Sequence, residues 1–140
     1  HAGPIVPVGD RISTFSPTLT AAVAKCAEAL AKSRGNTDDK FQWQRKLMPG
    51  GACEASAFQA YGHDATCVCL PLGNYHNMAD LAAVQAATNT APPAVAREYI
   101  SIADYHAMVD LLVACGERLS DAAGPGELIE KLWNQGKNVL

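Results

Sequence analysis

Leu70-Pro-Leu-Gly-Asn-Tyr-His-Asn-Met78 places a histidine among small and polar residues, directly after an apolar run that predicts a buried strand. Loops that follow the strands of an α/β sheet commonly hold the chemistry, because a rigid sheet supports them. A second stretch, Met48-Pro-Gly-Gly-Ala-Cys-Glu-Ala55, has the same design, a strand running into glycines and one acid. We expect these two glycine-containing turns to converge on one cleft.

The elements around the two turns are predicted to alternate between strands and helices. Apolar or alternating runs predict strands over residues 5–8, 41–47, 66–72 and 98–102. Helical spacing and caps predict helices from Ser16-Pro17 to Gly35, over 53–61, as a short helix followed by a loop within 79–96, and over 103–120 and 127–134. This order indicates a single α/β domain over residues 1–140, with a mostly parallel sheet covered by helices on both faces.

Three of these elements carry more specific expectations. Pro7 would interrupt a central ladder, so residues 5–8 are expected to form an edge strand. Residues 66–72 are almost all apolar, as in a strand that is buried on both faces. The last two helices are expected to bury one apolar stripe each, formed by Tyr105, Met108, Leu111, Leu112, Cys115 and Leu119, and by Leu128, Ile129, Leu132 and Trp133.

Composition narrows the function classes. The chain has 140 residues, of which 49% are hydrophobic and 18% charged, so it can bury a core and contains no predicted disordered tract. The net charge is −3 and the eleven basic residues are scattered, which argues against nucleic acid as a partner. No apolar run is long enough to span a bilayer, so no membrane partner is expected.

The five cysteines lie in apolar or small-residue settings, which is typical of reduced, buried thiols in a cytoplasmic protein. Cys67 and Cys69 are expected to point to opposite faces of their strand and therefore not to share a metal ion. No signal peptide opens the sequence, which begins His1-Ala-Gly-Pro.

His76 is the strongest candidate for a metal ligand. A histidine on a loop at the end of a strand has rigid support and solvent access, and its second ring nitrogen can be fixed by a neighbouring group. Asn74, Tyr75 and Asn77 surround it with polar groups, which raises the case for a site. The alternative is a surface side chain bonded to backbone.

Glu54 is the candidate acid of the other turn. It opens a predicted helix, where a carboxylate complements the helix dipole and caps free N–H groups, so a purely structural role remains open. The functional alternative is a carboxylate that faces the same cleft as His76. Gly50 and Gly51 either let the backbone approach a ligand closely or only allow a tight turn.

The succession of these pieces over residues 3–120 resembles the C-terminal part of the catalytic domain of the co-catalytic di-zinc aminopeptidases of the tetrahedral or deblocking type. The matching pieces are Gly3-Pro-Ile-Val-Pro-Val-Gly-Asp-Arg-Ile-Ser13 before a helix, Gly50-Gly51-Ala52-Cys53-Glu54-Ala55 after a strand, Tyr75-His76 after an apolar strand, and a helix opening near Asp104. The family usually has aspartate where this chain has Glu54, and residues 79–96 are an additional segment that suits a lid, a rim or an assembly contact.

The resemblance implies a half domain of a three-layer zinc-exopeptidase fold. It implies a zinc ligand at His76, an active-site acid at Glu54, substrate contacts at Gly50, Gly51, Asn74 and Tyr75, and two zinc ions that activate a water for attack on a peptide carbonyl. The family's other ligands lie N-terminal to the matching region, and none maps onto residues 1–140. We therefore expect a C-terminal piece of a metallopeptidase, acting on peptides only together with its N-terminal half and as a homo-oligomer.

Two other functions stay open at this point. The chain fits a non-catalytic α/β module for oligomerisation or peptide binding, in which case no metal and no exposed apolar patch are expected. It also fits a hydrolase with Cys53 as nucleophile, although the neighbouring Glu54 works against a reactive thiolate.

Overall fold

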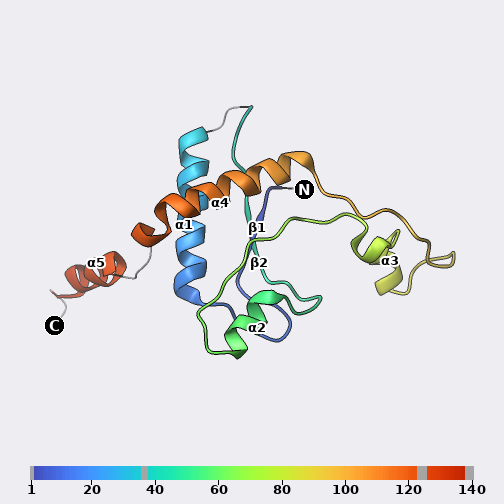
Figure 1. The fold of residues 1–140 in the computed structure, drawn as a ribbon, viewed down its shortest axis with the longest axis horizontal. Coiled ribbons are helices and arrows are strands. Elements are labelled where there is room, and N and C mark those ends of the chain that lie inside the picture. Colours follow the sequence, from blue (N-terminus) through green and yellow to red (C-terminus); the bar gives the residue numbers. More distant parts are fainter. Residues whose placement is uncertain (1, 36–37, 123–125, 138–140) are drawn as a thin grey trace.

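The computed structural model describes residues 2–35, 38–122 and 126–137, with side chains for 2–35, 38–120, 129–130 and 132–137. The elements in chain order are β1 (Ile5–Pro7), α1 (Pro17–Arg34), β2 (Gln44–Lys46), α2 (Glu54–Ala60), the 3-10 turn η1 (Tyr75–Asn77), α3 (Leu81–Gln85), α4 (Ile102–Ala122) and α5 (Gly126–Gly136). The fold is a small α/β structure with a two-stranded parallel sheet (Figure 1). All the predicted helices are present.

The first helix confirms its predicted boundaries. The Ser16 hydroxyl accepts a hydrogen bond from the backbone N–H of Leu19 at 3.4 Å, and Pro17 occupies the first turn, where its missing N–H costs nothing. Gly35 caps the C-terminus with a φ of 61°, in the left-handed region that favours glycine. The cap residues therefore set both ends of α1.

The sheet is smaller than predicted, and the structure describes two strands in it, β1 and β2. β1 and β2 pair in parallel with Val6 opposite Arg45, and α1 makes the crossover between them. On its other side Ile5 exchanges two backbone hydrogen bonds with Cys69 in an isolated antiparallel bridge. The sheet that the structure describes has only these two strands, so β1 is an edge strand as predicted apart from the single bridge at Ile5, and Pro7 lies where its missing N–H breaks no ladder bond.

Two predicted strands are reduced to single bridges. Residues 66–72 pair only at Cys69, and residues 65–71 are half-buried rather than enclosed on both faces. Residues 98–102 pair only through Tyr99, which bridges Gly73. The 41–47 strand is confirmed only over Gln44–Lys46. A strand needs partners along its length, and among the described residues these segments have one partner position each.

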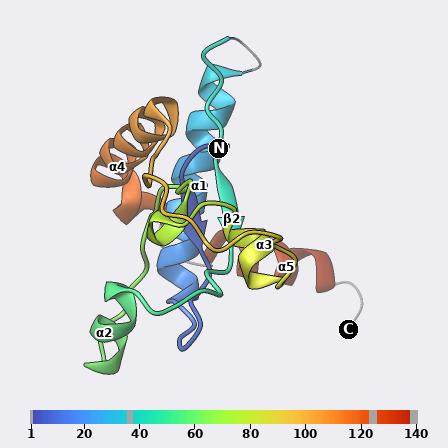
Figure 2. The same ribbon diagram turned by 90° about the vertical axis from the view of Figure 1, so that its right-hand side faces the viewer.

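The core lies between β1, α1 and α4. Its buried members are Val6, Val23, Cys26, Ala27, Phe41, Leu111 and Ala114. α4 crosses α1 in Figure 1, and Figure 2 shows the two helices beside each other. Leu111 of α4 is fully buried in this contact. The core therefore covers the Val6 face of β1, and a sheet with helices on both faces is not shown.

Several side chains predicted to be buried are exposed instead. On α4, Tyr105 is 47% exposed and Leu112 is 51% exposed, since they point away from α1. On α5, which lies beyond the end of α4 (Figure 1), Ile129, Leu132 and Trp133 are all more than half exposed. Leu128 lies outside the side chains that the structure describes. The predicted α4 stripe is therefore confirmed only in part, since Leu111 is buried and Cys115 and Leu119 pack against the core, whereas the described apolar side chains of α5 are exposed.

Candidate functional site

The two glycine-containing turns lie on opposite sides of one pocket of about 460 Å³, which we call the turn pocket. One wall is residues 46–53, running from the end of β2 to the N-terminus of α2. The other wall is residues 69–72 together with Tyr75, and Ile5 of β1 lies between the walls. Because successive strand residues point to opposite faces, Ile5 faces the turn pocket while Val6 faces the core.

The lining of the turn pocket is apolar and rich in sulfur. Lys46 is the one charged residue among those that line it, and Met48, Cys53 and Cys69 supply a thioether and two thiols. The space where a Cβ would lie on Gly50 or Gly51 is open, and neither has a positive φ. The fold itself therefore does not require glycine at these two positions.

Gly73, in the loop that carries His76, differs in this respect from Gly50 and Gly51, in the turn before Glu54. A Cβ on Gly73 would collide with the ring of Tyr99, whose backbone exchanges two hydrogen bonds with Gly73. A side chain at Gly73 would therefore displace the ring of Tyr99, which is 53% exposed, from its position over the loop. Glycine in this loop serves packing, whereas Gly50 and Gly51 border open space.

His76 lies next to the turn pocket without lining it. Its side chain is exposed, and its ring lies 4.0 Å from the ring of Tyr75, centroid to centroid. The backbone has a φ of 59°, and its N–H donates to Oε1 of Glu98 at 3.3 Å. The imidazole is therefore accessible to solvent, and its backbone is fixed by an acid 22 residues further along the chain.

The asparagines around His76 act within the protein. Asn74 donates its side-chain amide to the carbonyl of Arg97 at 2.9 Å, and Asn77 Oδ1 accepts from the N–H of Glu98 at 3.0 Å. They hold the histidine loop against residues 97–98. Asn74 does not line the turn pocket, and the polar cluster around His76 has this structural purpose.

Glu54 is exposed in the first turn of α2 and does not line the turn pocket, although Cys53 before it does. The carboxylate that serves the start of this helix is Asp10 instead. Asp10 is 5% exposed, accepts hydrogen bonds from the N–H groups of Ile12, Ser13 and Cys53, and also accepts from the hydroxyls of Ser13 and Ser56. These bonds, the one from Ser56 above all, hold the pKa of the Asp10 carboxyl well below its usual range.

Sequence reasoning missed Asp10 and Glu98 as parts of this region. For Asp10 a signal exists, because Asp-x-x-Ser in a turn predicts local capping of backbone N–H groups by the carboxylate. Its contact with Cys53, 43 residues away, has no such signal. Asp104, predicted near the start of the last long helix, is in the first turn of α4, where it is buried and accepts from the N–H of Gly3 at 2.9 Å.

The thiols differ from the prediction in two respects. All five cysteines are free, as predicted, but only Cys26 is buried, whereas the other four are half-buried. The prediction that Cys67 and Cys69 face opposite ways is wrong, because residues two apart in an extended segment share a face. Both thiols adjoin Cys53, whose charge adds to burial in raising the pKa of each.

The resemblance to zinc peptidases implies a metal site, which requires several ligand side chains close together. Among the residues that the structure describes, no group of three His, Cys, Asp or Glu side chains is placed to hold a metal ion. A catalytic zinc needs about three protein ligands and an open position. The described residues fit one ligand position at His76 and not a complete zinc site.

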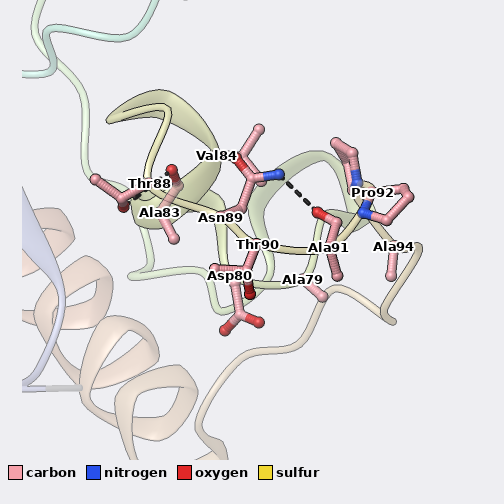
Figure 3. Close-up of a pocket in the computed structure, with 11 residues that line it drawn as sticks. Ala79, Asp80, Ala83, Val84, Thr88, Asn89, Thr90, Ala91, Pro92 and Ala94 are labelled. Carbon is pink, nitrogen blue, oxygen red and sulfur yellow. Dashed lines mark hydrogen bonds between the residues drawn. The ribbon is translucent and has the colours of Figure 1, made fainter.

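Residues 79–96 form a separate small loop that contains α3. It leaves and rejoins the main body at one neck, where Met78 bridges Val95 and the N–H of Ala79 donates to the carbonyl of Ala94 at 2.9 Å. Inside it lies a second pocket of about 340 Å³, in which Asn89 donates to the carbonyl of Ala91 and Asp80 is the one ionisable residue of the lining (Figure 3). None of residues 79–94 lines the turn pocket.

No helix within the described residues combines the length and apolar character needed to cross a membrane. Comparisons with protein-family models, with curated proteins and with solved structures found no match to this chain.

Proposed function

We propose that this chain is the C-terminal part of a zinc-dependent aminopeptidase catalytic domain, and that the turn pocket is part of its peptide-binding cleft. The observation that carries the proposal is the convergence of the two glycine-containing turns on one apolar pocket. An apolar lining suits a side chain of a peptide, and the open space above Gly50 and Gly51 suits the close approach of its backbone. Tyr75 lines the same pocket and adds an aromatic contact.

In this proposal His76 is one ligand of a two-zinc site. Its exposed ring lies beside the turn pocket, and the contacts with Tyr75 and Glu98 restrict the loop that carries it. The other ligands come from the N-terminal half of the same catalytic domain. Glu54, at the start of α2, is the acid at the rim of the cleft. Asn74 contributes to substrate binding indirectly, because its hydrogen bond to Arg97 holds the loop that carries Tyr75 and His76 in place.

The surface of the chain supports a missing partner of this kind. A compact monomer of 14.7 kDa exposes roughly 6,900 Å², whereas this chain exposes 9699 Å². Exposed apolar side chains follow helical spacing along α4: Ile102, Tyr105, Val109, Leu112 and Val113. Contiguous exposed apolar faces are typical of protein–protein interfaces.

The occupant of the α4 face is, in the proposal, the N-terminal half of the same enzyme. Docking there would cover the exposed side chains, and added strands would extend the β2–β1 sheet into the central layer of a three-layer domain. A second apolar face on α5, formed by Ile129, Leu132 and Trp133, is then available for a homo-oligomer contact in a cytoplasmic enzyme.

The test is an aminopeptidase assay of this chain alone and of the chain produced together with the polypeptide encoded upstream of it. We expect zinc-dependent release of N-terminal residues from unblocked peptides by the assembled protein, none by the chain alone, and loss of activity with a chelator that added zinc reverses. Absence of hydrolysis by an assembled protein that has bound zinc would refute the proposal.

A second function, a non-catalytic module for oligomerisation or peptide binding, shares the exposed α4 face but needs neither zinc nor a partner half. It predicts that the chain alone forms a stable oligomer or binds peptides without cleaving them. Sedimentation of the purified chain and of its Leu112→Asp variant separates the two. An oligomer held through the exposed face of α4, as the module requires, should dissociate in the variant, whereas a homo-oligomer held through α5, as the peptidase proposal expects, should remain.

A further inference from the structure

Cys53 lies in one wall of the turn pocket, and its thiol meets that of Cys67, which lies two residues before the other wall. The Sγ atoms lie 4.0 Å apart, in van der Waals contact, although the residues are 14 positions apart in the sequence. Cys53 directly precedes α2 and lines the pocket, and Cys67 lies on the extended segment whose later residues form the opposite wall. The sulfurs must come about 2 Å closer to reach the length of a disulfide bond.

We propose that Cys53 and Cys67 form a reversible disulfide on oxidation by a small-molecule disulfide, and that this bond fixes the two walls of the turn pocket to each other. The proposal rests on the placement of the sulfurs and does not depend on the peptidase function.

The reaction proceeds by thiol–disulfide exchange. The thiolate of Cys53 attacks one sulfur of the oxidant, the sulfur–sulfur bond of the oxidant breaks, and one thiolate leaves. Cys67 then loses its proton and attacks the Cys53 sulfur of the mixed disulfide, releasing the second thiolate. The two thiolates take up the two protons lost by the cysteines, so two protein thiols are oxidised and one disulfide molecule is reduced to two thiols.

The surroundings favour Cys53 as the residue that reacts first. It lines the turn pocket, so an oxidant reaches it from solvent. Burial raises the pKa of Cys67 to about 12, and the neighbouring Cys53, Cys69 and Asp10 act in the same direction, which keeps Cys67 protonated at neutral pH. Cys67 reacts in the second step, because by then the Cys53 sulfur is held next to it and no longer carries the charge that helps to keep Cys67 protonated.

The other three thiols provide internal controls. Cys69 shares the face of Cys67, but its thiol donates to Sδ of Met48 at 3.5 Å. Cys26 is 2% exposed and adjoins Cys115 in the contact between α1 and α4. A second thiol pair therefore exists in the same chain, but its Cys26 member is enclosed by the core, and we expect it to stay reduced while the fold is intact.

The experiment uses the unmodified chain, equilibrated in buffers with increasing ratios of oxidised to reduced glutathione and then alkylated with N-ethylmaleimide. We expect two of the five thiols to be lost to alkylation, and peptide mapping to find Cys53 joined to Cys67. Dithiothreitol should restore both. A disulfide between any other pair, or alkylation of all five thiols under conditions in which glutathione itself is oxidised, would overturn the proposal.

Two variants and one further measurement sharpen this test. Cys67→Ser should leave Cys53 as a mixed disulfide with glutathione, whereas the matched control Cys69→Ser should still form the Cys53–Cys67 bond. Amide hydrogen exchange of residues 50–53 should slow several-fold on oxidation of the unmodified chain and recover on reduction. Unchanged exchange in the oxidised protein would overturn the claim that the bond fixes the pocket walls.

Discussion

Asp10 and Ser56 are 46 positions apart in the sequence, and the Ser56 hydroxyl donates a hydrogen bond to Oδ2 of Asp10. The same oxygen accepts from the N–H of Cys53 at 3.0 Å, so one buried carboxylate joins the turn after β1 to the start of α2. This link fixes one wall of the turn pocket. The carboxylate at the α2 terminus thus comes from the N-terminal part of the chain, whereas Glu54 is exposed.

The first prediction compares these two acids. Oδ1 of Asp10 accepts three hydrogen bonds from residues 12 and 13, and Oδ2 accepts two from Cys53 and Ser56. Asp10→Asn replaces one of these oxygens with an NH2 group, which donates and cannot accept, so the midpoint of urea unfolding should fall clearly. Glu54→Gln changes an exposed side chain and should leave the midpoint almost unchanged. Circular dichroism during urea titration measures both, and a larger loss for Glu54→Gln would contradict the assignment.

The second prediction concerns pH. The folded-state pKa of Asp10 is lowered, so its stabilisation is fully present above the ordinary carboxyl pKa of about 3.9 and is lost as the pH falls below that value toward the folded-state pKa. The free energy of unfolding should therefore fall with pH below about 4. The fall should be shallower in Asp10→Asn, and parallel pH profiles for the two proteins would show that Asp10 is not the source.

The third prediction separates the two faces of α4. Leu111→Ala removes a fully buried side chain between α1 and α4 and should cost about 2–5 kcal/mol of unfolding free energy. Leu112→Ala, at the neighbouring position and 51% exposed, should change it by no more than about 0.5 kcal/mol. Denaturant titration of the isolated chain measures both values. Equal costs would mean that the α1–α4 contact is not the core.

The fourth prediction uses two glycines. Gly73→Ala places a methyl group where the ring of Tyr99 lies, so the ring must move toward solvent and lose its contact with the loop, and the melting temperature should fall. Gly50→Ala meets no atom of the chain and should be tolerated in the isolated protein. Thermal unfolding distinguishes the pair. If Gly73→Ala alone were neutral, the close approach of residue 99 to the loop would be wrong.

The helices of this chain are predictable from sequence because their signals are local. Ser16, Pro17 and Gly35 set the two ends of α1, and the apolar spacing of residues 103–120 predicts the position of α4. The sheet is less predictable, since a strand exists only where a partner lies beside it. The apolar run 66–72 has the composition of a buried strand, but in the described structure it meets β1 at Cys69 alone.

The candidate site divides in the same way. The convergence of the two turns follows from placing each after a strand, and the structure brings residues 46–53 and 69–72 together in one pocket. The partners of the individual side chains do not follow from sequence, because they are distant in the chain. Glu98 beside His76 and Asp10 beside Cys53 are contacts over 22 and 43 positions that no local pattern predicts.

The central claim is that His76 supplies one zinc ligand of a peptidase site that another part of the catalytic domain completes. The most direct measurement is the zinc-dependent hydrolysis of an unblocked peptide by the assembled protein carrying His76→Ala, with His63→Ala, at an exposed position in the connection after α2, as the matched control. Even groups that only orient a metal ligand typically contribute 10–100-fold, so we expect His76→Ala to lower kcat/KM at least about 100-fold and His63→Ala to leave it unchanged. Full activity and full zinc content in His76→Ala would contradict the claim.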